Sequence, residues 1–260
     1  MPDYRARRMY RFALRPRWLV GHVVALALVV GLASLGAWQL RRLDERRSFN
    51  DRFRQRSETT VALDAVASPD GLPESAVFRR VRVTGRFDAG REALVRFRIR
   101  DGLPGYEALT PLVVEGRTAV LVNRGWLPLD VGDAARAPTA APAGEVTVTG
   151  LLLEGEGASR FRPEERPDGR LVIGAIAVGE LERRLGYDLY PGFVQLHEPD
   201  DPDRFPAPLP EPDLSEGPHL TYALQWFSFT VIAAGGWALL VRASAKRQRT
   251  RPPGPTTPSH

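Results

Sequence analysis

Two long apolar runs near the ends of the chain dominate its pattern of hydrophobic and polar positions. The first covers residues 18–40 and the second residues 220–241, and neither contains Asp, Glu, Lys or Arg. Each is about 22 residues long, enough for an α-helix to cross the hydrocarbon core of a bilayer. A cleaved signal peptide is the alternative for the first run, which is long for that role and lacks a clear A-x-A site. We therefore expect two transmembrane helices that flank one large polar domain, residues 41–219.

The charges beside the second run indicate the orientation of the chain. Its leading flank is acidic and proline-rich, whereas its trailing flank, residues 242–260, is basic. Basic flanks mark the cytoplasmic side of a membrane helix. The first run has arginines on both sides, in residues 1–17 and 41–47, and does not decide the question alone. We expect a multi-pass protein of a bacterial plasma membrane, with both termini cytoplasmic and the central domain outside.

The net charge of +5 and the pI near 10 come from the two tails. Residues 1–17 and 242–260 hold 6 and 5 of the 36 basic residues and 1 of the 31 acidic ones, which leaves 25 basic and 30 acidic residues between them. The central domain is thus acidic, and the tails suit an anionic lipid surface rather than nucleic acid. The absence of cysteine excludes disulfides, thiolate metal sites and covalent c-type haem attachment.

Alternation with a period of two indicates β-strands in the central domain. In residues 78–87 (FRRVRVTGRF), Val81, Val83 and Phe87 alternate with Arg and Thr, as in a half-buried strand. Further strands are predicted at residues 93–100, 106–114, 118–123, 146–153, 171–177 and 192–196, a short helix at 178–185, and a continuation of the first helix over 41–56. This spacing favours a mainly antiparallel β (α+β) domain, barrel- or sandwich-like, between the two terminal transmembrane α-helices.

Five motifs, in order along the whole chain, resemble the surfeit locus protein 1 family. They are LGAWQLRRLDER, FRRVRVTGRF, GYEALTPL, VLVNRGWLPLD and HLTYALQWFSF. Members of that family are membrane proteins that assist the assembly of haem-copper cytochrome c oxidase. The resemblance implies a non-enzymatic role in delivering haem a, transiently bound, to the catalytic subunit of the oxidase. Its implied partners are that subunit, haem a synthase and membrane lipid.

His219 is the candidate ligand of the haem iron. It stands just before the second apolar run, and at helical spacing it shares a face with Tyr222 and Trp226. A neutral imidazole there could ligate haem iron, with aromatic rings packed on the macrocycle. The alternative is an interfacial aromatic belt with a flanking histidine. The match to the family pattern H-x-x-Y-A-x-Q-W favours the ligand.

Trp38, Gln39 and Arg41 lie at the corresponding end of the first apolar run. If the two helices pair, these residues meet His219 and Gln225 at one depth. Small residues on both helices would allow a close approach: Gly31, Ser34, Gly36, Ala37, Gly235 and Gly236. Gln39 and Gln225 would then serve either a structural hydrogen bond or the binding of haem or partner. His22, at the other end of the first run, is not expected to take part in chemistry.

Within the central domain, Asn123, Arg124, Gly125 and Trp126 end a predicted strand. We expect a turn or bulge in which the glycine relieves strain and the tryptophan fills the core. The alternative is that Arg124 binds a carboxylate such as a haem propionate. His197 and the acids that follow it, at positions 198, 200, 201 and 203, resemble a solvated loop more than a metal site.

Two other functional classes remain for comparison. An enzyme is disfavoured, because the chain has no nucleophile elbow, H-E-x-x-H, P-loop or dinucleotide fingerprint. A structural scaffold that clamps oxidase subunits without binding haem would share every feature except the purpose of His219.

Overall fold

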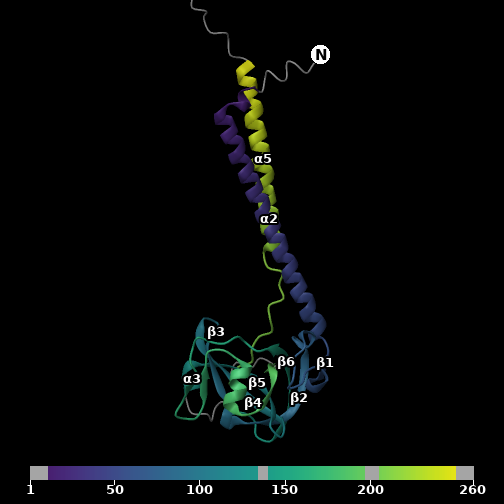
Figure 1. Cartoon of the computed structure of the whole chain (residues 1–260), viewed down its shortest axis with the longest axis vertical. Helices are drawn as coiled ribbons and strands as arrows, with labels where there is room; N and C mark the ends of the chain where they lie inside the picture. Colours follow the sequence, from purple (N-terminus) through teal and green to yellow (C-terminus); the bar gives the residue numbers. More distant parts are fainter. Residues whose placement is uncertain (1–10, 134–139, 197–204, 250–260) are drawn as a thin grey trace, which may run out of the picture. The chain divides into compact units, whose positions relative to one another are not determined.

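The computed structural model describes residues 11–133, 140–196 and 205–249. An apolar helix near each end of the chain flanks a mostly-strand, barrel-like domain (Figure 1). The chain divides into two compact units. The first comprises Met1–Phe49 and Leu214–His260 and contains the helix pair, and the second is Asn50–Asp213.

The two long helices are α2 (Pro16–Ser57) and α5 (His219–Arg249). Each contains a window long and apolar enough to cross a membrane. The predicted continuation of the first helix over residues 41–56 is confirmed, because α2 extends to Ser57. This part is rich in Arg, a strong helix former. The domain boundaries at residues 17, 40, 219 and 241 stay predictions. A 3₁₀ turn, η1 (Arg11–Leu14), precedes α2.

The second unit contains nine strands and several short helices. The strands are β1 (Thr60–Ala62), β2 (Arg80–Phe87), β3 (Ala93–Arg100), β4 (Leu103–Glu115), β5 (Thr118–Pro128), β6 (Glu145–Glu154), β7 (Glu164–Glu165), β8 (Leu171–Ile173) and β9 (Asp188–Leu196). The short helices are η2 (Leu63–Ala65), η3 (Glu74–Ala76), η4 (Ala89–Arg91), α3 (Leu129–Asp133) and α4 (Val178–Leu185).

Part of this sheet closes on itself as a barrel. The strand order is β1-β2-β6-β9-β5-β4-β3-β8-β7, and an additional pairing joins β2 to β4. The ring therefore runs β2, β6, β9, β5, β4 and back to β2, which removes the sheet edges within it. The closing contact is short, with Arg86 opposite Val113 and Phe87 opposite Leu112. A Cβ on Gly85 would overlap the Val113 carbonyl oxygen, so only glycine fits this approach of two backbones.

The prediction of a mainly antiparallel, barrel-like sheet is confirmed in its main point, and three pairings differ from it. β1 runs parallel to β2, β3 to β8, and β5 to β9. Strand bounds also differ. β5 continues past Asn123 to Pro128, β9 begins at Asp188 rather than at Gly192, and β8 ends at Ile173. These differences arise because pairing partners, not local alternation, decide where a strand ends.

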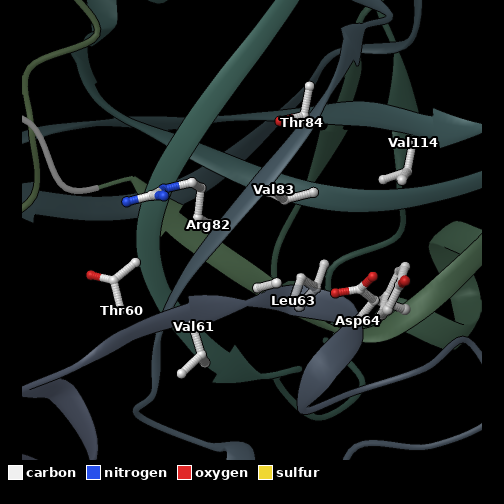
Figure 2. A pocket seen from close by; sticks show the side chains of 10 residues that line it. Thr60, Val61, Leu63, Asp64, Arg82, Val83, Thr84 and Val114 are labelled. Atoms are coloured by element: carbon white, nitrogen blue, oxygen red, sulfur yellow. The ribbon is translucent and has the colours of Figure 1, made fainter.

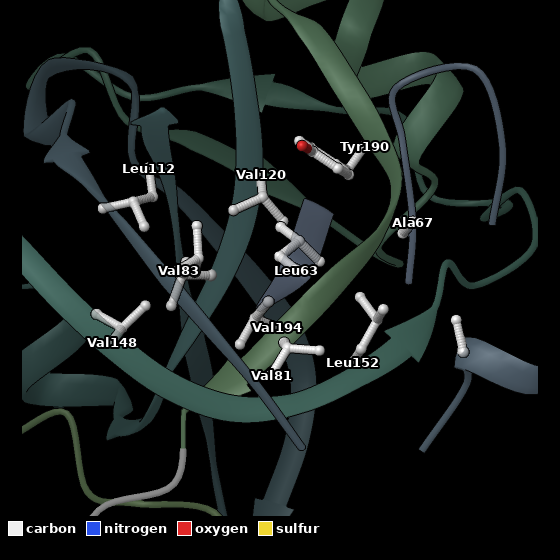
Figure 3. Close-up of a cluster of buried hydrophobic side chains, with 12 residues drawn as sticks. Leu63, Ala67, Val81, Val83, Leu112, Val120, Val148, Leu152, Tyr190 and Val194 are labelled. Atoms are coloured by element: carbon white, nitrogen blue, oxygen red, sulfur yellow. The ribbon is translucent and has the colours of Figure 1, made fainter. Parts of the chain in front are cut away.

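Apolar side chains fill the barrel and cover one of its outer faces. The interior cluster includes Val81, Val83, Leu112, Val120, Leu152 and Val194 (Figure 3). The helix α4 packs Val178, Leu181 and Leu185 on a second cluster, which contains Leu121 and Phe193. The predicted bounds of α4 are confirmed, and it ends at Gly186, whose φ of 71° is the left-handed conformation that glycine adopts freely.

Candidate functional site

The helices α2 and α5 lie side by side in the first unit and make specific contacts in the first part and in the middle of α5. A Cβ on Gly36 would come within 2.8 Å of the Phe227 ring, and one on Gly21 within 2.6 Å of the Trp237 ring. These two glycines therefore admit aromatic rings from α5. The prediction that Gly31, Gly235 and Gly236 also allow a close approach of the helices is wrong, because a Cβ on any of these three would meet nothing within 4 Å.

His219 and Gln39 form the polar contact at one end of the helix pair. The Nδ1 atom of His219 lies 2.9 Å from the Oε1 atom of Gln39, and Gln39 is only 9% exposed. An amide oxygen only accepts hydrogen bonds, so Nδ1 carries the proton and donates it. The neutral ring then keeps a lone pair on Nε2, the atom available to a metal. The structure thus brings together two of the residues that the sequence placed at one depth.

His22 and Trp237 form a second polar contact between the helices, in which the histidine accepts the hydrogen bond instead of donating it. The indole Nε1 of Trp237 donates to Nδ1 of His22 over 2.9 Å. Indole nitrogen is only a donor, so Nδ1 of His22 accepts and its ring proton lies on Nε2. The neutral His22 ring therefore has no free lone pair for a metal. Of the two neutral rings, only that of His219 keeps a lone pair on Nε2.

The segment before α5 is held against α2 by two arginines. The Arg46 Nε donates to the Ser215 carbonyl oxygen over 3.0 Å, and the Arg47 guanidinium pairs with both carboxylate oxygens of Glu216 at 2.9 Å. Gly217 follows with a φ of 67°, a conformation that other residues rarely adopt. These contacts fix the direction in which the chain enters α5 at His219. Because Arg46 and Ser215 are 169 residues apart, no local sequence signal could have paired them.

The other residues predicted for this site differ in exposure. Trp38 and Tyr222 are 44% and 46% exposed, so each presents part of its ring on the helix surface. Trp226 is half-buried and contacts the ring of Phe229 edge-on. Gln225 is exposed.

Arg41 is also exposed, on the same turn of α2 as Gln39. The neighbouring Arg42 guanidinium, and not Arg41, lies over the ring of Trp38, 5.8 Å from the ring centre.

In the barrel, residues 123–126 form a β-bulge inside β5. Glu107 pairs with Trp126 and Leu109 with Asn123, so Arg124 and Gly125 together oppose Ala108. Gly125 has a φ of 129°, and a Cβ there would overlap the Ala207 carbonyl oxygen. The backbone of Trp126 exchanges two hydrogen bonds with Ala207, and its side chain is 6% exposed. The bulge and the core tryptophan have the structural form expected of this motif.

Arg124 already has a carboxylate partner within the barrel. Its Nη1 donates to Glu92 Oε2 over 2.9 Å, and both side chains are buried, at 7% and 4% exposure. Thr110 donates to the same Glu92 oxygen. A buried guanidinium without such a partner would carry a large desolvation cost. The geometry therefore gives Arg124 a structural role, and a propionate would have to compete with Glu92.

A second charged group of the barrel surrounds Glu107. Burial raises the pKa of the Glu107 carboxyl, and the Arg98 guanidinium and the Asn123 amide, which donates to it over 2.8 Å, partly oppose this rise. Arg98 also pairs with Glu156 at 2.6 Å. Asn123 thus acts inside this network, and sequence reasoning missed Glu92, Glu107 and Glu156, which lie far from it along the chain.

No cluster of three or more His, Cys, Asp or Glu that could hold a metal occurs among residues 11–133, 140–196 and 205–249. The acidic segment around His197 lies outside the described residues.

The fold and the helix contacts define a class of protein in which two long apolar helices flank a barrel-like β domain. The sequence profile of the SURF1 family matches residues 26–231, and the chain belongs to this family. SURF1 is the surfeit locus protein 1 family that the motifs resemble. It is known broadly as a family of oxidase assembly factors rather than enzymes.

Related proteins extend the match over nearly the whole chain. An uncharacterised SURF1-like protein of Mycobacterium tuberculosis is 30% identical over 250 residues, which cover 95% of this chain and 92% of the relative. A SURF1-like protein of Monosiga brevicollis is 25% identical, covering 88% of this chain and 91% of the relative. One of Drosophila melanogaster is 27% identical, covering 78% and 71%.

Proposed function

We propose that this protein is a membrane-anchored assembly factor that holds haem a through His219 and presents it to the catalytic subunit of a haem-copper cytochrome c oxidase. The observation that carries the proposal is the contrast between the two histidines of the helix pair. His219 donates from Nδ1 to Gln39 and keeps a lone pair on Nε2, whereas His22 accepts from Trp237 at Nδ1. Only the first arrangement can ligate iron.

The residues around His219 fit the requirements of a haem ligand. When bound, haem supplies an iron that accepts the Nε2 lone pair. Gln39 fixes the tautomer and orientation of the ring, as hydrogen-bond partners of metal-ligating histidines do. The half-exposed rings of Trp38 and Tyr222 offer apolar surface for a macrocycle at the side of the helices. One imidazole ligand and an open surface suit a group that must later be released to another protein.

The spacing of the two polar contacts supports a membrane location for the helix pair. His22 and Gln39 are separated along α2 by about 26 Å at 1.5 Å per residue. That is close to the thickness of a hydrocarbon core, about 30 Å. Both contacts would then lie near the membrane surfaces, with uncharged residues between them. The basic flank after α5 favours cytoplasmic termini, and hence a bacterial protein whose barrel domain and His219 are extracytoplasmic.

The test replaces each histidine in turn in the full chain, produced in cells that make haem a. We expect the wild-type protein to co-purify with haem a, His219→Ala to lose the Soret absorbance, and His22→Ala to retain it. Gln39→Leu should lower occupancy about 10- to 100-fold, because it removes the group that orients the ligand. Equal haem content and unchanged spectra in wild type and His219→Ala would refute the ligand role and leave the scaffold as the better function.

A further inference from the structure

The end of β3 and the start of β4 form a two-stranded hairpin that extends beyond the rest of the sheet. Among the described residues, β8 pairs with β3 only over residues 93–95, and β5 pairs with β4 only from Gly105 onward. Past these points the two strands pair with each other alone, with Ile99 opposite Pro104. We call residues 96–104 the hairpin tip.

Large apolar side chains are exposed on both faces of the hairpin tip. Phe97, Ile99 and Leu103 are 66%, 74% and 59% exposed. Leu103 lies opposite Arg100, the neighbour of Ile99 along β3. Successive residues of a strand point to opposite faces, so Leu103 and Ile99 lie on opposite faces of the hairpin. The flat surface of a partner protein would cover one of these faces, whereas a fluid apolar medium would surround both.

The backbone at Phe97 is strained, and the strain keeps an aromatic ring at the surface. Phe97 has a φ of 66°, a conformation that bulky residues rarely adopt. It lies at the register shift between Val95 and Arg98, a β-bulge of the kind that turns a side chain in a new direction. Its ring contacts Phe161 edge-on, yet most of it stays exposed. Strain at an exposed aromatic residue indicates a function for that side chain.

Three arginines surround these aromatic rings. The Arg96 guanidinium carbon lies 4.5 Å from the centre of the Phe97 ring and 4.4 Å from that of the Phe161 ring. Phe161 stands between Arg160 and Arg162 in the sequence, and both of these arginines are exposed. None of the three forms an ion pair with a residue that the structure describes. The rings and the arginines together make a basic, aromatic surface beside the hairpin tip.

The hairpin tip also lies beside the segment of the second unit that leads toward α5. The Arg100 Nη1 donates to the Pro208 carbonyl oxygen over 2.9 Å. His219, the first residue of α5, follows Pro208 by 11 positions, and a chain of that length spans at most about 40 Å. With α5 beginning at a membrane surface, as proposed above, this short connection keeps the hairpin tip within reach of the same surface.

We propose that the hairpin tip inserts into the surface of a bilayer that contains anionic lipids. Its apolar side chains enter the boundary between headgroups and acyl chains, and Arg96, Arg160 and Arg162 bind lipid phosphates. Guanidinium groups pair well with phosphate, and apolar residues bordered by arginines are typical of segments that lie in the membrane interface. The inference rests on the membrane location proposed above, and it does not depend on haem binding.

The test places single fluorophores on the full chain in nanodiscs of phosphatidylcholine and phosphatidylglycerol, some of which carry a quencher on an acyl chain. The chain has no cysteine, so Ile99→Cys and Leu103→Cys each take one fluorophore. We expect the lipid to quench both. Val114→Cys is the control, because Val114 lies near the other end of β4, in the lining of a pocket beside Leu63 and Val83 (Figure 2), and should not be quenched. These nanodiscs contain no other protein, so quenching identifies lipid rather than an acidic partner protein.

Variants that carry the fluorophore at position 103 locate the interaction. Arg160→Gln should lower the ratio of inserted to free hairpin tip about fivefold, whereas Arg82→Gln, at an exposed position of β2, should not change it. Phe97→Gly should lower the same ratio about tenfold. Its denaturant midpoint should stay close to that of the wild type, because glycine adopts a positive φ freely. A purely structural role of Phe97 would lower the midpoint and leave the quenching unchanged.

A fluorophore on Leu28→Cys, at an exposed position of α2, separates the two ways in which the proposal can fail. Quenching at position 28 but at neither 99 nor 103 would refute insertion of the hairpin tip and leave the membrane location intact. No quenching at position 28 would refute the membrane location and the insertion together. Quenching at 99 and 103 that persists unchanged in both Arg160→Gln and Phe97→Gly would also refute the proposal, because the fluorophores alone would then be drawn into the lipid.

Discussion

The polar side chains of the helix pair and of the barrel have different kinds of partner. In the barrel, buried charges occur in clusters and satisfy one another, as Glu92, Thr110 and Arg124 do. In the helix pair, the polar contacts described between α2 and α5, or between α2 and the segment just before α5, involve a histidine or an arginine. Buried charges thus pair with one another in the barrel, whereas each histidine of the helix pair meets a single uncharged partner.

This difference bears on the two motifs that the sequence offered as binding sites, residues 123–126 and His219. Residues 123–126 look like a binding motif, with an asparagine, an arginine and a tryptophan, yet the sheet uses them for a bulge and a buried ion pair. His219 begins the apolar helix α5, and its hydrogen bond to Gln39 through Nδ1 leaves a lone pair on Nε2. Three experiments would sharpen or break this comparison.

The largest effect should come from removing the buried arginine. Arg124→Ala leaves the Glu92 carboxylate buried without its ion-pair partner, and breaking such a pair costs about 3–5 kcal/mol. Arg184→Ala, which breaks an exposed pair with Glu180 on α4, should cost between about 0 and 1 kcal/mol. Denaturant unfolding of the full chain in detergent, followed by tryptophan fluorescence, measures both.

The same variant can break the comparison. If Arg124→Ala remains as stable as Arg184→Ala but loses co-purified haem, then Arg124 binds a ligand carboxylate. In that case the barrel motif is a functional site and the contrast between the two regions is wrong.

A smaller effect is expected from closing the gap that admits Phe227 into α2. Gly36→Val places a Cβ 2.8 Å from the Phe227 ring and should destabilise the helix pair by about 1–3 kcal/mol, as overpacking does. Gly31→Val should not, because a Cβ there meets nothing within 4 Å. The chain has no cysteine, so fluorophores on Val24→Cys and Leu239→Cys can report helix separation by energy transfer during SDS titration.

Equal midpoints for the two glycine variants would contradict this packing. Such a result would mean that other contacts between α2 and α5, rather than the fit of Phe227 against Gly36, hold the two helices together.

The smallest effect concerns the pH dependence of the barrel. Burial raises the pKa of Glu107, so the folded state binds this proton more tightly than the unfolded state. Its contribution is then most favourable below the ordinary pKa of a glutamic acid and is lost as the pH rises through the folded-state pKa. Glu107→Gln should remove this loss, so the stability difference between variant and wild type should grow in favour of the variant as pH rises.

Thermal unfolding between pH 4 and pH 7 measures this difference, with Glu154→Gln as the exposed control. A difference between Glu107→Gln and wild type that shrinks with rising pH would mean that the charged carboxylate, paired with Arg98, is the stabilising form.

Much of the local structure could be predicted from the sequence. Runs without charge mark α2 and α5, alternation marks β2 and β3, and the bounds of α4 follow from its apolar spacing and Gly186. The order of the motifs along the chain also points to the family. The strand β1 could not be predicted, because it is three residues long and carries no clear alternation.

The sequence by itself determined the two apolar helices, the strand-rich domain between them and the presence of a histidine at the start of α5. These follow from side-chain polarity at fixed periods, which depends only on neighbours along the chain. Only the tertiary structure decided that the sheet closes through β2 and β4, that Arg124 is neutralised by Glu92, and that His219 donates to Gln39, 180 residues away. Each depends on groups that meet only when distant segments pack, and the protonated nitrogen of a histidine is set by whichever group it meets there.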